Sequence, residues 1–213
     1  MKILSHRGYW KREDEKNTKI AFERSFQLGF GTETDIRDLN GELVISHDPP
    51  TIDCQYLTVA DFFKIYKIWG DGLQLALNIK SDGLQRKLMQ LIIDFNITNY
   101  FVFDMSIPDT IGFIKNNSKF FTRQSEYEID PAFYTQADGV WLDEFNGHWI
   151  DDEVIQKHIK NGKKVCIVSP ELHKRSYNIE WDNYKNIFLK DSEHKISICT
   201  DFPEKANFFL NEN

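Results

Sequence analysis

The feature that most constrains the fold is a repeated alternation of short β-rich segments and longer helical segments. The β-rich segments have the length of strands, and most of them precede a stretch with helical spacing of apolar residues. Eight strand-then-helix units follow one another, with strands expected at 2–6, 32–37, 73–80, 100–105, 119–124, 139–145, 163–169 and 196–200. Helical segments are expected at 17–30, 59–68, 84–95, 109–115, 131–136, 152–159 and 204–210, with a less regular stretch after the seventh strand.

This alternation predicts an α/β fold. Strands that alternate with helices pair in parallel through right-handed crossovers, and eight such units close most naturally into a (β/α)8 TIM barrel. We therefore expect a single TIM-barrel domain over residues 1–213, with a short β-hairpin insertion after strand 2. A doubly wound open sheet is the alternative, but its first turn is usually Gly-rich, and "SHRGYW" is not a GxGxxG sequence.

Composition limits the possible partners. The chain has 213 residues, of which 41% are hydrophobic, and a formal net charge of -7, which argues against a broad nucleic-acid-binding surface. No apolar run reaches the length of a membrane span, and the first residues lack the apolar stretch of a signal peptide. These features predict a cytoplasmic protein without stable membrane insertion and leave the oligomeric state open. The three cysteines form no CxxC pair, and Cys166 and Cys199 are expected to be buried in strands.

Polar residues gather where the first three predicted strands end, which in a barrel is the active face. Residues two apart on a strand share a face, so Glu33 and Asp35 should point together into the barrel interior, where charges need partners. The residues concerned are His6 and Arg7 on the first strand, Glu33 and Asp35 on the second, and Asn78 and Lys80 on the third.

A divalent cation is one possible partner for the two acids. Carboxylates about 7 Å apart along one strand face can converge on a single ion. All-oxygen ligation suits Mg²⁺ or Ca²⁺ rather than zinc. The alternative interpretation is a strand of surface charges at an antiparallel edge, because Glu33-x-Asp35 is a weak motif by itself.

A hairpin brings a second histidine back toward the acids. Asn40-Gly41 is a strong turn signal between two extended segments, and His47 lies near the end of the second. A two-residue turn places His47 opposite Thr34, on the wrong face, whereas a three-residue loop over 40–42 places it opposite Asp35. The sequence leaves both registers open, and the functional interpretation needs the second register or a bulge.

Together these residue types describe cleavage of a phosphodiester. Imidazoles titrate near neutral pH, so one of His6 and His47 can accept a proton while the other donates one. Arg7 offers a planar fork for phosphate oxygens, and Lys80 adds a point charge. A metal ion held by the two acids would neutralise developing negative charge. Each residue taken alone also has a structural interpretation, so the hypothesis rests on the joint pattern.

The first fifty residues also resemble a known family, the glycerophosphodiester phosphodiesterases of the phosphatidylinositol-phospholipase-C-like superfamily. The third strand "LALNIK" and the closing strand "ICTDFPEKA" are similar to the family as well. The matching positions are His6-Arg7-Gly8, Asn17-Thr18, Ala21-Phe22, Gly29, Glu33-x-Asp35, Gly41 and His47-Asp48.

The resemblance implies a TIM barrel and a metal-dependent phosphoric diester hydrolase of lipid metabolism, acting through the substrate's own hydroxyl. It implies that His6 and His47 are the acid and base, and that Glu33 and Asp35 bind the metal. Arg7 would bind phosphate. The sequence departs from the family at Asn78, where a glutamate ligand is usual. An asparagine oxygen can bind the metal but brings no charge, so we expect weaker metal affinity. The alternatives are a different ligand, such as Asp143, or lost activity.

The predicted function is hydrolysis of a small glycerophosphodiester or a related polyol-phosphate diester, with Mg²⁺ or Ca²⁺ as cofactor. Lys80 and Trp141 are expected to contact the substrate, although barrel packing is an equally reasonable role for Trp141. The alternative is a catalytically impaired pseudoenzyme that binds a phosphate ligand on the same barrel. Asn78 favours that alternative, and the presence of both histidines argues against it.

Overall fold

The structure is a computed structural model that describes residues 2–191 and 193–211. The chain divides into two compact units. One is Ser5–Phe120, and the other consists of residues 2–4 and the described residues from Phe121 onward. The prediction of a single domain stays a prediction.

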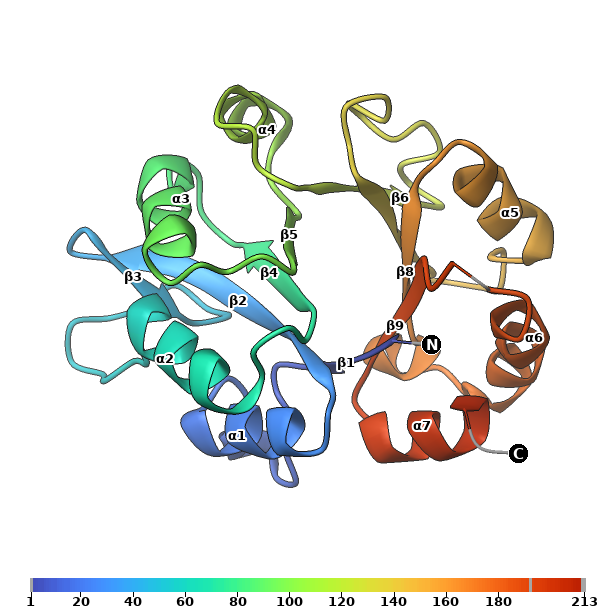
Figure 1. Cartoon of the computed structure of the whole chain (residues 1–213), viewed down its shortest axis with the longest axis horizontal. Helices are drawn as coiled ribbons and strands as arrows, with labels where there is room; N and C mark the ends of the chain where they lie inside the picture. The colour runs from blue at the N-terminus through green and yellow to red at the C-terminus, as the bar shows by residue number, and fades with distance from the viewer. Residues whose placement is uncertain (1, 192, 212–213) are drawn as a thin grey trace. The chain divides into compact units, whose positions relative to one another are not determined.

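The first unit contains the end of β1 and the following elements as far as α4 (Figure 1). Its strands run in the order β5-β4-β2, all parallel, and residues 5–6 of β1 flank β2. β3 pairs antiparallel with β2, which confirms the predicted hairpin. The elements are β1 (Lys2–His6), η1 (Glu13–Glu15), α1 (Lys19–Gln27), β2 (Gly31–Leu39), β3 (Glu42–Ile45), α2 (Val59–Trp69), β4 (Leu75–Ile79), α3 (Gln85–Asp94), β5 (Tyr100–Phe103) and α4 (Ile107–Lys115).

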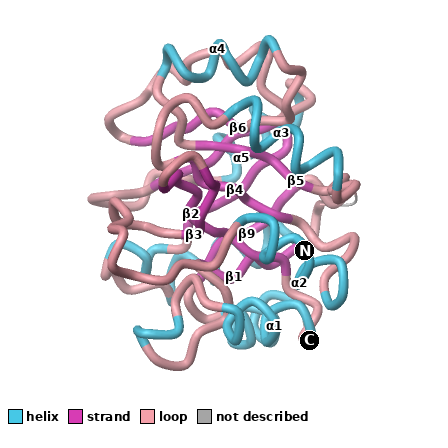
Figure 2. Tube along the Cα trace, turned by 90° about the vertical axis from the view of Figure 1, so that its left-hand side faces the viewer, coloured by secondary structure: helices cyan, strands magenta, loops and turns pink. Residues whose placement is uncertain are grey.

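The second unit repeats the alternation of strands and helices. Its strands run in the parallel order β9-β8-β7-β6, and residues 2–4 of β1 flank β9. Figure 2 distinguishes strands, helices and loops by colour, with the strands in magenta. The elements are β6 (Phe121–Ser125), β7 (Gly139–Asp143), α5 (Asp152–Lys160), β8 (Lys164–Val168), η2 (Pro170–His173), α6 (Asn178–Phe188), β9 (Ile196–Thr200) and α7 (Pro203–Asn211).

Most predicted elements are present, and two predictions are wrong. The segment 131–136 forms a turn rather than a helix, because Phe133 adopts a positive φ of 55° that breaks a helical run. The irregular stretch after β8 contains the helix α6, which the sequence pattern did not reveal. The Thr58 hydroxyl caps α2, since it accepts a hydrogen bond from the Asp61 amide at 3.0 Å.

Aromatic side chains hold α1 and α2 together in the first unit. The Phe22 and Phe62 rings meet edge to face with centroids 4.6 Å apart, and Phe26 meets Tyr66 in the same way at 5.6 Å. Such pairs stabilise a core beyond the area that they bury. Figure 1 shows the two helices side by side, so this cluster fixes α1, which supports the loop after β1.

Two further expectations concern the burial of two cysteines and the absence of a membrane span. Cys166 and Cys199 are buried in β8 and β9, as predicted. Among the residues that the structure describes, no helix is both long and apolar enough to cross a bilayer.

Candidate active site

The chain leaves β1 through a tight turn that presents Arg7. Both Arg7 and Gly8 have positive φ, at 59° and 80°. A Cβ on Gly8 would lie 2.7 Å from the Ala21 Cβ in α1, so only glycine fits there. The Gly8 amide donates to the Thr32 hydroxyl at 3.0 Å, and the Arg7 amide donates to the carbonyl of Glu33 at 3.1 Å. The turn is therefore fixed against α1 and β2.

Strand register places the two acids beside Asn78. In the parallel pair β2–β4, Asp35 is the direct partner of Asn78, and Glu33 is the partner of Ala76. All three polar side chains are buried, with exposed fractions of 2% for Glu33, 0% for Asp35 and 7% for Asn78. The interpretation of Glu33 and Asp35 as surface charges at a sheet edge is therefore wrong.

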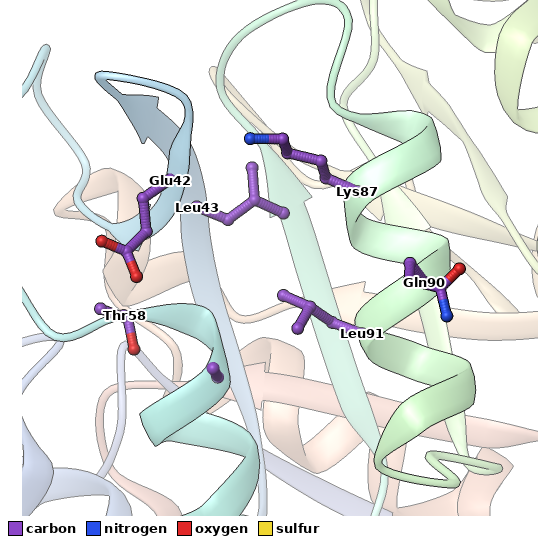
Figure 3. Close-up of a pocket in the computed structure, with 7 residues that line it drawn as sticks. Glu42, Leu43, Thr58, Lys87, Gln90 and Leu91 are labelled. Atoms are coloured by element: carbon purple, nitrogen blue, oxygen red, sulfur yellow. The ribbon is translucent and has the colours of Figure 1, made fainter.

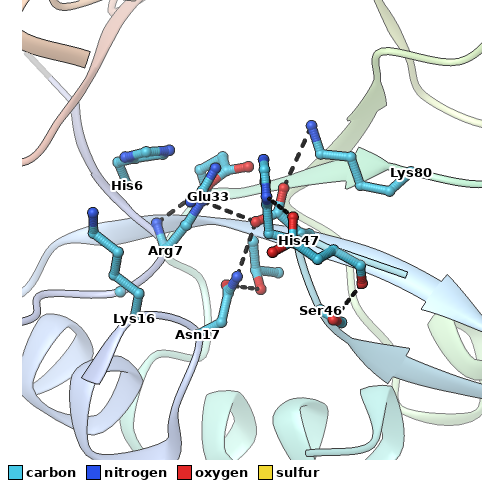
Figure 4. Close-up of polar contacts among 12 residues, drawn as sticks. His6, Arg7, Lys16, Asn17, Glu33, Ser46, His47 and Lys80 are labelled. Atoms are coloured by element: carbon cyan, nitrogen blue, oxygen red, sulfur yellow. Dashed lines mark hydrogen bonds and ion pairs between the residues drawn. The ribbon is translucent and has the colours of Figure 1, made fainter. Parts of the chain in front are cut away.

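Asp35 makes polar contacts with Arg7, Asn17 and Lys80, which are labelled in Figure 4. Its Oδ2 is 3.0 Å from the Nε of Arg7 and accepts a hydrogen bond from the Asn17 amide at 2.9 Å. Its Oδ1 is 3.6 Å from the Nζ of Lys80. Two cationic side chains thus flank one buried carboxylate, as burial of a charge requires.

Two buried oxygens on these neighbouring strands lack hydrogen-bond partners. Asp35 Oδ1 and Asn78 Oδ1 are both buried with no hydrogen bond. Unsatisfied buried oxygens are rare and call for a water or an ion as partner. Oxygen donors on neighbouring strands are the ligands that Mg²⁺ and Ca²⁺ prefer, so the residues present fit a divalent cation.

Burial and the negative charge of Asp35 together raise the pKa of Glu33 to about 8, because Arg7 and Lys80 offset them only in part. Glu33 Oε2 still accepts a hydrogen bond from the Arg7 amide at 3.1 Å. Without a metal ion, the Glu33 carboxyl therefore holds a proton at neutral pH. Because a metal ligand must be deprotonated, cation binding is expected to release that proton.

The raised pKa of Glu33 predicts a pH dependence of stability for the metal-free protein. Between the ordinary value of 4.5 and about 8, the folded state binds more protons than the unfolded state. The free energy of unfolding should therefore fall as the pH rises through this window. Thermal unfolding in chelator from pH 5 to pH 8 would show a declining Tm that Glu33→Gln flattens. The exposed variant Glu42→Gln is the control, and an equal decline in all three proteins would contradict this assignment.

The register of the hairpin corrects one expectation about His47. Leu39 pairs with Glu42, so the turn has two residues and the three-residue alternative is wrong. Regular pairing would then have put His47 on the wrong face. However, β3 ends at Ile45 and, although the Ser46 amide still donates to the Asp35 carbonyl at 3.1 Å, the chain bends at His47. The His47 ring consequently lies in the polar group of Figure 4, with 47% of its side chain exposed.

A cavity of about 720 Å³ opens beside this group. Arg7 and His47 both line it, together with residues of the loops that follow β1 and β3. His47 Nδ1 lies 2.8 Å from a carboxylate oxygen of Asp48, which orients the ring. Figure 4 shows His6 beside Arg7, with Lys80 on the opposite flank of the group. The volume is within the range of small-molecule sites.

Two further predicted residues lie in the other unit. Trp141 is in β7 and is 5% exposed. Asp143 ends the same strand, and its Oδ1 is 2.5 Å from His173 Nε2. This unit does not contain Glu33 and Asp35. The predicted role of Trp141 in substrate binding and that of Asp143 as a metal ligand therefore stay predictions.

The second unit contains another acidic group that could in principle hold a metal. Oxygen or nitrogen atoms of Glu144, His148 and Glu180 lie within 4.8 Å of one another. Arg175 already contacts both carboxylates, at 3.3 Å from Glu144 and 2.9 Å from Glu180. Two backbone amides of the following loop donate to Glu144 at 2.9 and 2.7 Å. Glu144 is therefore satisfied as an anchor for that loop.

A smaller cavity of about 250 Å³ lies between the hairpin and α3 (Figure 3). Leu43 and Leu91 face it, with Lys87 above them. None of the acids or histidines described above lines this cavity. Its lining includes Glu42 and Lys87 but no histidine, whereas Arg7 and His47 line the 720 Å³ cavity, which is therefore the better candidate.

Comparison with known proteins adds information at the level of fold. No protein-family model matches the sequence, and no curated protein matches it significantly. Solved structures do match. A glycerophosphodiester phosphodiesterase from Agrobacterium tumefaciens aligns with a TM-score of 0.71 at 14% identity over 98% of both chains.

Two other structures extend this likeness. A phosphodiesterase from Oleispira antarctica, in complex with the product sn-glycerol-3-phosphate, aligns with a TM-score of 0.66 at 14% identity, over 99% of this chain and 97% of that one. A Ca²⁺-dependent phosphatidylinositol-specific phospholipase C from Streptomyces antibioticus aligns with a TM-score of 0.60 at 11% identity, over 99% and 96%.

The chain has the fold of the glycerophosphodiester phosphodiesterases. The predicted (β/α)8 TIM-barrel class is thereby confirmed, and the resemblance drawn from the sequence is confirmed at the level of the fold. At these identities the likeness concerns the fold alone.

Sequence reasoning missed the part that Asn17 plays in this phosphodiesterase fold. Asn17 is not the N-cap of α1, which is Thr18. Asn17 instead adopts a positive φ of 59° and donates its side-chain amide to Asp35. Its carbonyl oxygen accepts a hydrogen bond from the Thr34 hydroxyl at 3.0 Å. The family resemblance, which includes Asn17, was the one signal that could have indicated this role.

Proposed function

We propose that this chain is a metal-dependent phosphodiesterase that hydrolyses a glycerophosphodiester or a related glycerol- or polyol-phosphate diester. The observation that carries the proposal is the buried group of Glu33, Asp35 and Asn78 with two cationic side chains beside it. Its occurrence on a fold shared with glycerophosphodiester phosphodiesterases supports the same conclusion.

In this proposal, Glu33, Asp35 and Asn78 hold a Mg²⁺ or Ca²⁺ ion. When bound, the ion supplies positive charge that orients the substrate and neutralises developing negative charge. The unpartnered oxygens of Asp35 and Asn78 support this assignment. The Ca²⁺ dependence of the Streptomyces phospholipase supports a divalent cation of this kind.

Arg7 and Lys80 bind the phosphate. The Arg7 guanidinium contacts Asp35 through Nε, and its position on the cavity wall leaves donors for phosphate oxygens. Lys80 lies beyond hydrogen-bond distance of Asp35, at 3.6 Å, so its ammonium can turn toward a bound anion. Both cations would then contact the non-bridging oxygens of the diester.

The two histidines transfer the protons. His47 Nδ1–H donates to Asp48, which leaves Nε2 as an acceptor, so His47 acts as the base. It takes the proton from a substrate hydroxyl, whose oxygen attacks phosphorus while the bond from phosphorus to the leaving alcohol breaks. His6 gives a proton to that alcohol. Water then opens the cyclic phosphate with the two roles exchanged, as microscopic reversibility requires.

The substrate is a small molecule. The 720 Å³ cavity beside Arg7 and His47 can receive a polar alcohol, because charged and amide side chains form much of its wall. The complex of the Oleispira phosphodiesterase with sn-glycerol-3-phosphate supports a glycerol phosphate moiety. Trp141 is included as a further substrate contact on the sequence prediction.

The test is a panel of glycerophosphodiesters with choline, ethanolamine and glycerol groups, incubated with purified protein and Mg²⁺ or Ca²⁺. ³¹P NMR should show conversion to a phosphomonoester, with a cyclic phosphate as intermediate, and chelator should stop it. Tight binding of a diester without turnover would contradict the proposal and show that the chain is a phosphate-binding protein instead. Turnover that continues after complete chelation would show that the reaction does not depend on a metal ion.

A further inference from the structure

A third carboxylate lies next to the acidic group, on the strand after Asn78. Asp104 directly follows β5, and the last residue of that strand, Phe103, pairs with Asn78 in parallel register. Asp104 therefore projects from the same edge of the sheet one step beyond Asn78. Its backbone has a φ of 66°, in the left-handed region that an aspartate adopts at an energetic cost. Such backbone conformations cluster at functional sites.

One ammonium group lies between two of the acids. Lys80 Nζ is 3.6 Å from Asp35 Oδ1 and 3.9 Å from Asp104 Oδ2. Both distances exceed those of a hydrogen bond, so Lys80 balances the two charges without being held by either one. A cation of higher charge, with oxygen ligands at close range, would compete well for this place.

The charges of the site show why a third acid matters. Glu33 and Asp35 as carboxylates are balanced by Arg7 and Lys80, and Asn78 adds oxygen but no charge. Affinity for Mg²⁺ and Ca²⁺ depends on the number of charged ligands. The unpartnered buried oxygens of Asp35 and Asn78 point independently to a missing cation.

We propose that Asp104 supplies the third negative charge of the divalent-cation site formed by Glu33, Asp35 and Asn78. Cation binding takes over the charge balance of Asp35 and Asp104 and leaves Lys80 to contact the phosphate. This inference rests on the proposed function for the identity of the site. The inference adds to that site Asp104, the residue that directly follows β5.

The test measures metal binding without substrate. Isothermal titration of the purified chain with MgCl₂ or CaCl₂ gives the Kd for the wild type and for Asp104→Asn. Asparagine tolerates the left-handed backbone, so the variant keeps its fold while losing the charge. We expect its Kd to rise by about 10- to 100-fold, the cost of losing a supporting group at a metal site. Asp82→Asn, an exposed acid in the preceding loop, is the charge-matched control.

A rescue separates metal binding from general structure. Asn78→Glu returns a carboxylate to the neighbouring strand, so the double variant Asn78→Glu/Asp104→Asn should recover most of the lost affinity. A wild-type Kd for Asp104→Asn, or a loss equal to that in Asp82→Asn, would overturn the inference and leave the proposed function intact. If the wild-type chain binds neither cation, the inference and the metal in the proposed function both fail.

Discussion

Replacing either His6 or His47 with alanine is expected to lower kcat for a glycerophosphodiester by about 10²- to 10⁴-fold, the usual contribution of a positioned acid or base. The cause is loss of proton transfer rather than loss of binding, because Arg7 and Lys80 remain beside Asp35. Binding of the product phosphomonoester should therefore be almost unchanged. Steady-state kinetics and calorimetric titration with sn-glycerol-3-phosphate measure the two effects separately.

Substrates with a good leaving group distinguish the two histidines. A nitrophenolate needs no proton to leave, so His6→Ala should regain most of its activity on a nitrophenyl diester of glycerol phosphate. His47→Ala should stay impaired, because attack by the substrate hydroxyl still needs a base. His194→Ala is the control, since His194 is an exposed loop residue before β9. Equal losses on both substrates for both variants would contradict the assignment of acid and base.

Local pattern was sufficient to predict the sheet. Most strands are short apolar runs, and alternation along the more polar β2 correctly put Glu33 and Asp35 in a buried environment. The same reasoning failed for α6, where Trp181 and Tyr184 are buried by tertiary packing within a segment of polar character. Tertiary contacts override local propensity in such segments.

The details of the site depend on geometry that the sequence does not encode locally. His47 lies in the polar group of Figure 4 because the chain bends beyond the end of β3 at Ile45, a departure from regular pairing that neither turn register specifies. Asp104 escaped notice because an acid after a strand is common, and its proximity to Lys80 depends on the pairing of β4 with β5. Pairing of distant strands is set by the whole fold, so the positions of these side chains could not be predicted from the sequence.

The two neighbouring acids should respond differently to neutralisation. Asp35→Asn removes the charge that Arg7 and Lys80 both contact, and leaves those cations beside an amide. Breaking a fully buried ion pair costs about 3–5 kcal/mol. Here about 1–3 kcal/mol is expected, because both cations keep some contact with water. Glu33→Gln should cost much less in the metal-free protein near pH 7, because the raised pKa of Glu33 already keeps that carboxyl protonated.

Metal binding and catalysis should nevertheless fail in both variants, because each removes one of the carboxylates that hold the cation. Urea unfolding in chelator at pH 7 gives the stability difference, and calorimetric titration with MgCl₂ or CaCl₂ gives the affinity. Added cation should raise the Tm of the wild type and of neither variant, since a ligand that binds only the folded state stabilises it. Equal destabilisation by the two substitutions would show that Glu33 is charged in the metal-free protein, and would remove the basis for its proton release on metal binding.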